Sequence, residues 1–188
     1  LGALRLVDPQ LELVAPRDQA ALVSRGVADV EGRRLSGEQL RELADLFPDQ
    51  APVQEAVAIH AGRIGRRDKL PLLPVVRRAF ELTGDPEHRE ALGVNLARTL
   101  LQVDQLEECL ARCEQMAREP WSAEARATVL ALRAEAWGRQ EVWDAALSDL
   151  QRAEAAFPGL PTREPLLWAR VLRGGGQLER AWTMAVTG

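Results

Sequence analysis

Cys109 and Cys113 have the most reactive side chains in this sequence, because thiolates bind soft metals and form disulfides. The two cysteines lie four residues apart, which puts both on one face of a helix. That face is the apolar stripe expected to pack inward, where a free cysteine behaves as a small hydrophobic residue. His60 and His88 have no spacing that would join them to the thiols as metal ligands. We therefore expect a structural cysteine pair, no metal site and no cofactor.

The remaining candidates for catalysis are weak. No spacing along the chain brings a serine or cysteine to a histidine as a nucleophile and its base. Acidic neighbours such as Glu107 and Glu108 are typical of a solvent-facing helix surface rather than of acid–base chemistry. The run Gly174-Gly175-Gly176 lacks the preceding strand and the following Lys-Ser/Thr of a phosphate-binding loop. We expect it to be a turn between two helices, in a protein that is not an enzyme.

Composition narrows the class of protein further. The 188 residues are 46% hydrophobic and 28% charged, which is typical of a globular chain. The net charge of −4 gives no support to direct binding of nucleic acid or of a membrane surface. No apolar run approaches the ~18 residues of a membrane span. We expect a cytoplasmic protein whose partners are proteins or peptides.

Helix signals follow one another along most of the chain. Ser36-Gly37-Glu38-Gln39 is a capping box that predicts a helix start. Asp85 before Pro86 predicts another helix start. Asp104 with Glu107, and Ser122 after Pro120, predict two more. These signals indicate about ten helices joined by short turns, which is the pattern of antiparallel helix pairs.

The predicted domain organisation has two parts. Residues 1–17, where leucines alternate with polar residues, are expected to form an extended or hairpin-like lead-in. Residues 18–188 are expected to form a helical repeat domain. Its predicted pairs cover 18–48, 51–84, 86–119, 122–157 and 162–188.

The helix pairs are similar to one another in sequence. Four alanines, 36, 37 and 35 residues apart, anchor the comparison: Ala61, Ala97, Ala134 and Ala169. Three residues after each anchor stands a large apolar residue: Ile64, Leu100, Trp137 and Leu172. Twelve residues after each anchor stand Leu73, Cys109, Ala146 and Ala181. A repeat of this length with two helices per unit predicts an α-solenoid.

The unit from Ala127 to Pro158 resembles the tetratricopeptide repeat (TPR) family. Its second helix carries Trp143-Asp144-Ala145-Ala146-Leu147, similar to the family's aromatic–Asp–Glu–Ala–Ile run, with Ala145 in place of the usual acid. The resemblance covers residues 54–188, with one good repeat and three degenerate ones. It implies an all-α fold, a right-handed superhelix of about five antiparallel helix pairs.

The resemblance also implies a ligand site on the first helices of the pairs, which line a concave groove in this family. Carried over to this chain, the groove residues are Arg66, Asn95, Arg98, Gln102, Glu135, Arg139, Arg170 and Arg173. The arginines would form a basic track, and Asn95 stands where the family often places an asparagine that bonds ligand backbone. The alternative is that Arg66, Arg139 and Arg173 complement helix C-terminal dipoles.

Two hypotheses for function follow. In the first, the chain is a protein–protein interaction scaffold whose arginine-lined groove binds an acidic peptide or helix. In the second, it is a sensor or oligomerisation module cut from a larger regulator, such as a transcription factor or signalling ATPase. A first residue of Leu1 rather than Met motivates the second. A homodimer through the ends of the solenoid is a further expectation. Trp121 and Trp182 are either exposed interface anchors or side chains that cover repeat junctions.

Overall fold

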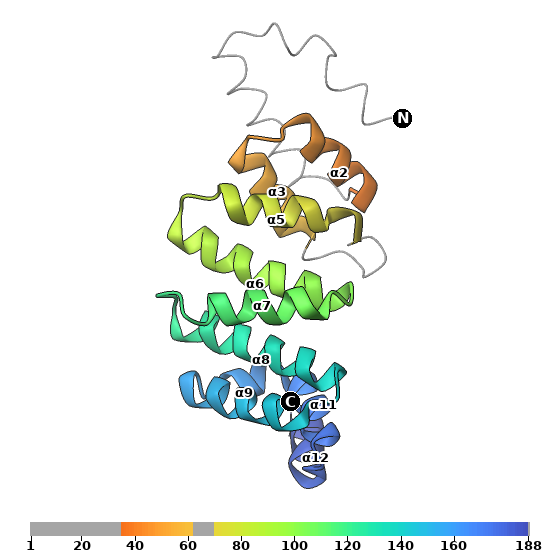
Figure 1. Cartoon of the computed structure of the whole chain (residues 1–188), viewed down its shortest axis with the longest axis vertical. Helices are drawn as coiled ribbons and strands as arrows, with labels where there is room; N and C mark the ends of the chain where they lie inside the picture. The colour runs from red at the N-terminus through yellow and green to blue at the C-terminus, as the bar shows by residue number, and fades with distance from the viewer. Residues whose placement is uncertain (1–34, 62–69, 188) are drawn as a thin grey trace, which may run out of the picture. The chain divides into compact units, whose positions relative to one another are not determined.

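A computed structural model describes residues 35–61 and 70–187, and these residues form helices and turns without any strand (Figure 1). The predicted all-α class is confirmed for this part of the chain. The expected lead-in over 1–17, the start of the first predicted pair and Arg66 lie outside the described residues.

The chain divides into two compact units, Leu1–Leu96 and Ala97–Gly188, with the division inside helix α6 (Pro86–Gln102). The described part of unit 1 holds α2 (Gly37–Leu46), α3 (Ala51–Ala61), the short 3-10 helix η3 (Leu70–Leu72) and α5 (Leu73–Leu82). Helix α3 packs against both α2 and α5. The core of this unit is therefore built around α3.

Local capping explains where α2 and α6 begin. The Gln39 amide donates to the Ser36 hydroxyl at 3.3 Å, and the Ser36 amide donates to the Gln39 side chain at 2.9 Å. The predicted capping box is thus present at the start of α2. The Asp85 carboxylate accepts from the backbone amides of Glu87 and His88 at 2.8 and 3.2 Å. These two bonds cap the start of α6 where the sequence indicates.

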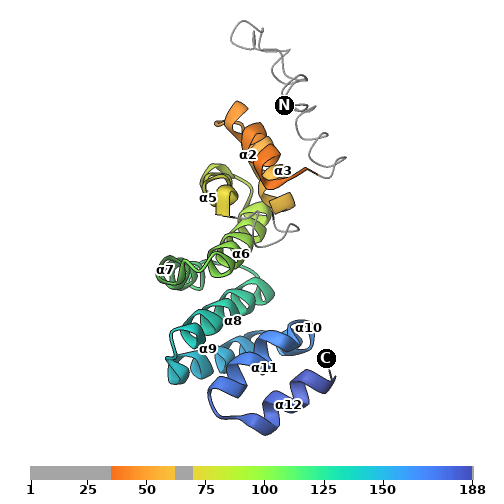
Figure 2. The same cartoon turned by 90° about the vertical axis from the view of Figure 1, so that its right-hand side faces the viewer.

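Unit 2 continues from α6 through α7 (Leu106–Met116), α8 (Ala123–Arg139) and α9 (Trp143–Ala156). It ends with α10 (Leu160–Arg163), α11 (Pro165–Gly174) and α12 (Leu178–Thr187). Helix α8 contacts α7, α9 and α11, and α12 lies beside α11 (Figure 2). Because it has neighbours on several sides, α8 buries residues around most of its circumference. It is the central helix of the unit.

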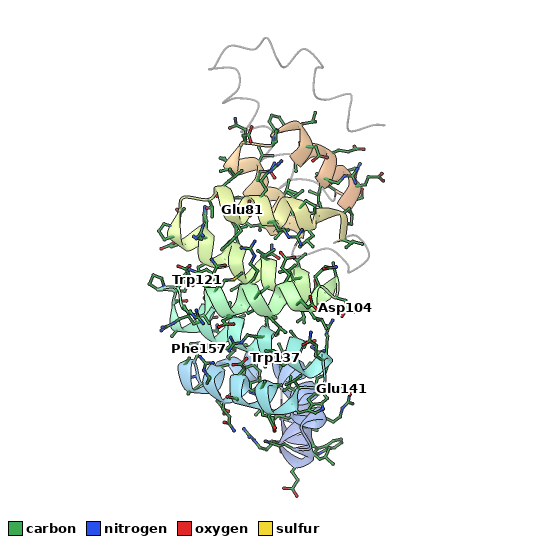
Figure 3. The ribbon with its side chains drawn as sticks, viewed as in Figure 1. Glu81, Asp104, Trp121, Trp137, Glu141 and Phe157 are labelled. Carbon is green, nitrogen blue, oxygen red and sulfur yellow. The ribbon has the colours of Figure 1, made fainter. Side chains whose placement is uncertain are left out.

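The same turn joins the two helices of three successive pairs. The residues Asp104, Glu141 and Gly176 have φ angles of 66°, 62° and 78°, in the left-handed region. Figure 3 labels Asp104 and Glu141 in the turns after α6 and α8. The amide of the following residue donates in each case to a carbonyl five residues back, at 2.9, 3.0 and 2.8 Å: Leu100, Trp137 and Leu172. This bond is the Schellman closure of a helix C-terminus, repeated at the spacing of the sequence columns.

One helix start differs from its prediction. Asp104 does not cap α7; the N-cap is Gln105, and no side chain bonds there. The backbone of Asp104 is committed to the left-handed turn, a conformation that Asp tolerates better than most residues. Its carboxylate instead accepts from Arg139 at 3.3 Å. Ser122, by contrast, caps α8 as predicted, accepting from the Ala125 amide at 3.1 Å.

The glycines at the end of α11 allow close packing against α9 and also form the turn to α12. A Cβ on Gly174 would lie 2.1 Å from the ring of Trp143, and one on Gly175 would lie 2.8 Å from Leu147. Both glycines therefore let the end of α11 approach the side chains of α9 closely. Gly176 supplies the left-handed residue of the turn.

Candidate functional site

The structure places the predicted groove residues in different settings. Asn95 lies in unit 1, where its side-chain amide donates to the carbonyl of Ala58. Arg98 and Gln102 lie on the part of α6 that belongs to unit 2. The other described members, all in unit 2, lie on α8 and α11: Glu135, Arg139, Arg170 and Arg173. These four side chains come together.

Glu135 is the centre of that cluster. Its side chain is only 10% exposed, and its two carboxylate oxygens accept from Arg139 at 3.1 Å and from Arg170 at 2.9 Å. Arg139 also donates to the carbonyl of Leu101 at 2.7 Å. The carboxylate of a buried helix thus orients one arginine from its own helix and one from α11. Charge-assisted hydrogen bonds of this kind are the stronger ones in proteins.

The basic track is accordingly made largely of paired arginines. Arg98 forms an ion pair with Glu164, and Arg139 and Arg170 share Glu135. Arg173 is exposed at the end of α11, and no carboxylate of the described residues lies within ion-pairing distance of it. The sequence shows the arginines but not their partners, two of which lie 35 and 66 residues away along the chain.

A hollow of about 290 Å³ lies over this cluster, and we call it the arginine hollow. Its walls come from α8, the start of α9 and α11. The lining residues are Glu135, Gly138, Arg139, Trp143, Arg170, Val171 and Arg173. Three arginines against one glutamate leave the lining positively charged. The hollow can therefore accept an anionic group beside an apolar one.

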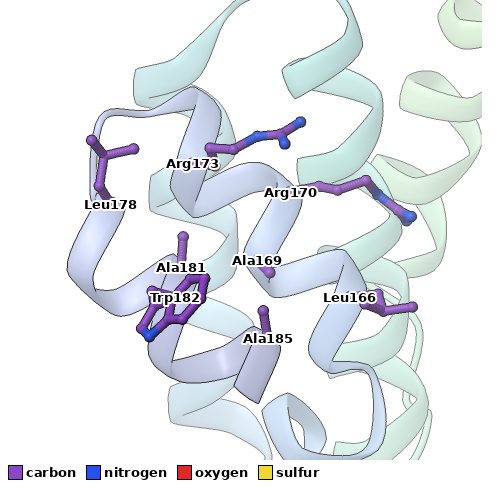
Figure 4. Close-up of a pocket in the computed structure, with 8 residues that line it drawn as sticks. All are labelled: Leu166, Ala169, Arg170, Arg173, Leu178, Ala181, Trp182 and Ala185. Atoms are coloured by element: carbon purple, nitrogen blue, oxygen red, sulfur yellow. The ribbon is translucent and has the colours of Figure 1, made fainter. Parts of the chain in front are cut away.

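A larger hollow of about 580 Å³ lies between α11 and α12, and we call it the hairpin hollow (Figure 4). Its lining residues are Leu166, Ala169, Arg170, Arg173, Leu178, Ala181, Trp182 and Ala185. Leu166, Leu178 and Trp182 are 67%, 64% and 72% exposed. Of the two sequence interpretations of Trp182, exposure rather than burial at a repeat junction is the one observed. Arg170 and Arg173 line both hollows.

The two cysteines lie in the core of unit 2. Both are buried, with their sulfur atoms 4.0 Å apart. The hydrogen bond with Cys109, together with burial, raises the pKa of the Cys113 thiol well above its usual range. No group of three or more His, Cys, Asp or Glu side chains gathers as metal ligands within residues 35–61 and 70–187. The pair fills space between α7 and the neighbouring helices.

A buried ion pair joins α8 to α9 and was not anticipated from the sequence. The Arg133 guanidinium donates twice to the Asp149 carboxylate, at 2.6 Å for each bond. The bonded carboxylate raises the pKa of Arg133, so that its charge persists despite partial burial. This pair holds the two helices together and faces neither hollow.

Comparisons with protein-family models, with curated proteins and with solved structures gave no match to this chain. Among the helices described, none is both long and apolar enough to span a membrane.

Proposed function

We propose that the chain is a helical-repeat interaction module of the TPR type, stacked as a right-handed α-solenoid, that binds an acidic peptide segment of another protein. The arginine hollow is the observation that carries this proposal. Arg139 and Arg170 share one buried carboxylate there, that of Glu135, and Arg173 lines the same hollow. Such a module holds a partner rather than transforming it, so the proposal assigns no catalytic residue.

The three identical turns support the repeat architecture. Asp104, Glu141 and Gly176 stand 37 and 35 residues apart and share one backbone conformation. Ala134 and Ala146, the small residues at equivalent positions of the repeat in α8 and α9, are fully buried. Their counterparts on α11 and α12 are Ala169 and Ala181. Recurrence of both the turn and the small residues favours one hairpin unit used several times.

The chemistry of the arginine hollow favours an acidic ligand. A guanidinium carries five N–H donors, and Glu135 occupies only some of those on Arg170, whose side chain is 55% exposed. Arg173, at the rim, adds a second cation. A ligand carboxylate can bridge such donors, and Glu135 holds Arg170 in place so that less side-chain entropy is lost on binding. Trp143 and Val171 offer an apolar wall to the neighbouring ligand residue.

Selection from a random display library of 12-residue peptides tests this proposal. Peptides enriched on the wild-type chain are expected to be rich in Asp and Glu next to an apolar residue. Their binding should weaken about tenfold, or about 1.4 kcal/mol, in Arg139→Gln and Arg173→Gln. Arg126→Gln is the matched control, because Arg126 is exposed on α8 outside both hollows.

Neutral substitutions are preferable to charge reversal here. A glutamate at Arg139 or Arg170 would face Glu135, and one at Arg98 would face Glu164. Such like-charge contacts would disturb the fold as well as the ligand site. Circular dichroism and thermal melts should show that each glutamine variant is folded. Selected peptides without acidic bias, or with equal affinity for wild type and both variants, would contradict the proposal.

A further inference from the structure

The residues that line the hairpin hollow form two matching helical stripes. Leu166, Ala169, Arg170 and Arg173 follow the i, i+3, i+4, i+7 spacing on α11, and Leu178, Ala181, Trp182 and Ala185 follow it on α12. Each stripe therefore occupies one face of its helix. Subtraction of 35 residues gives the equivalent positions on α8 and α9: Ala131, Ala134, Glu135, Gly138, Trp143, Ala146, Leu147 and Leu150.

On the α8–α9 pair, a helix covers much of this surface and leaves the arginine hollow at its edge. Helix α11 packs against both α8 and α9. Ala131, Ala134, Ala146 and Leu150 are buried beneath it or between the pair. The end of α11 reaches the last part of the stripe, where Gly174 and Gly175 lie against Trp143 and Leu147.

On the α11–α12 pair, no helix within residues 35–61 and 70–187 covers the corresponding surface. Figure 4 shows Trp182, Ala181 and Ala169 facing the space between the two helices. Leu178 and Trp182, the counterparts of Trp143 and Leu147, are 64% and 72% exposed. The surface that receives α11 on one pair is thus open on the next. Its shape and apolar character are those of a groove for a helix.

The hairpin hollow is the open groove of the α11–α12 pair, and its charge differs from that of the covered groove on the α8–α9 pair. In the covered groove, Glu135 of the floor accepts from Arg170 of the covering helix at 2.9 Å. In the open groove, Arg170 takes the position of Glu135, and Arg173 takes the position of Gly138. None of the residues that line the open groove is acidic. A helix that covers it would therefore gain a charge-assisted hydrogen bond by carrying an acid where α11 carries Arg170.

We propose that the hairpin hollow binds an amphipathic helix of another protein, with an apolar stripe and an acidic residue placed to meet Arg170 and Arg173. The proposal rests on the proposed function and specifies the class of partner. Charge argues against a second copy of α11 as the occupant, because its Arg170 would face the Arg170 of the groove. A small residue in the partner helix is expected opposite Trp182, as Gly175 lies opposite Leu147.

Two synthetic helices test this assignment with the whole chain. The first, the arginine peptide, has the sequence of residues 164–175, constrained by a side-chain bridge on its solvent face because short helices are otherwise marginal in water. The second, the acid peptide, differs only by Arg170→Glu and Arg173→Glu. Fluorescence anisotropy of labelled peptides measures binding to the chain. The acid peptide is expected to bind at least about tenfold more tightly than the arginine peptide.

Variants of the chain then locate the bound helix. Trp182→Ala and Arg173→Gln should each weaken the acid peptide about tenfold, while Arg126→Gln leaves its affinity unchanged. Of the two hollows, Trp182 lines the hairpin hollow and Arg139 lines the arginine hollow. If Trp182→Ala leaves the affinity for the acid peptide unchanged, this inference is refuted. If Arg139→Gln leaves the affinity for the library peptides unchanged, the proposed function is refuted.

Three further results would overturn the inference. The first is equal affinity for the two peptides, because it would show that the arginines do not select the partner. The second is undetectable binding of the acid peptide at millimolar concentration. The third is a dimer in sedimentation equilibrium that dissociates in Trp182→Ala, which would make a second copy of the chain the occupant.

Discussion

The substitution Gly174→Ala tests how closely α11 packs on α9. The new Cβ would lie 2.1 Å from two ring carbons of Trp143, where ordinary van der Waals contact needs at least 3.4 Å. The obstacle is an indole ring held between helices rather than the free end of a flexible chain. The ring or the end of α11 must therefore move.

The expected cost follows from two opposing effects. Replacement of glycine by alanine in a helix normally stabilises it by up to about 1 kcal/mol. Overpacking of a well-filled contact costs about 1–3 kcal/mol, and the distance of 2.1 Å argues for the upper part of that range. We expect a net loss of about 2 kcal/mol, which lowers Tm by about 4–8 °C for a chain of this size.

Thermal unfolding followed by circular dichroism measures this effect. Gly84→Ala is the matched control, because a Cβ at Gly84 would meet no atom within 4 Å, and its Tm should change by less than about 2 °C. Trp143→Leu in the Gly174→Ala background should show a favourable coupling of about 1 kcal/mol or more, because the smaller side chain removes the clash. A Tm for Gly174→Ala above that of wild type would refute the close approach of α11 to Trp143.

Three further substitutions test the cluster, the core and the repeated turn. Glu135→Gln removes the charge that Arg139 and Arg170 share, and urea denaturation should show a loss of about 1–3 kcal/mol. Cys113→Ala should cost about 1–2 kcal/mol by leaving a small cavity in the core; in wild type, burial and the raised pKa of Cys113 should keep that thiol unreactive toward Ellman's reagent until the protein unfolds. Glu141→Gly should raise the free energy of unfolding by about 1 kcal/mol, because glycine adopts the φ of 62° without the steric penalty; a decrease would contradict the left-handed turn.

Helix caps could be predicted from the sequence because they depend on neighbours within three residues. Ser36, Asp85 and Ser122 each bond the amides that their local sequence indicates. The prediction that Asp104 caps α7 was wrong because the same residue type is found in two local structures. An aspartate can cap a helix or adopt the left-handed conformation of a turn. Here the C-terminus of α6 closes through Asp104, which therefore adopts the left-handed conformation.

The candidate site could be predicted only in part. The repeat spacing indicates which arginines lie on first helices, but a spacing within one helix says nothing about partners on another. The Glu135–Arg170 and Arg98–Glu164 pairs join residues 35 and 66 positions apart. From the sequence, exposure of Trp182 was one of two alternatives, the other being burial at a repeat junction. The hollow beside it depends on the packing of α12 against α11, which the sequence does not show.

The most direct test of the proposed interaction is an NMR titration of the tryptophan indole resonances with the tightest peptide from the library selection. The chain has five tryptophans, of which Trp143 lines the arginine hollow and Trp121 lies in the turn before α8, outside both hollows. The Trp143 indole signal should shift on binding, and the Trp121 signal should not move. A shift of Trp121 with Trp143 unmoved, or binding that shifts no indole signal, would contradict the proposed interaction.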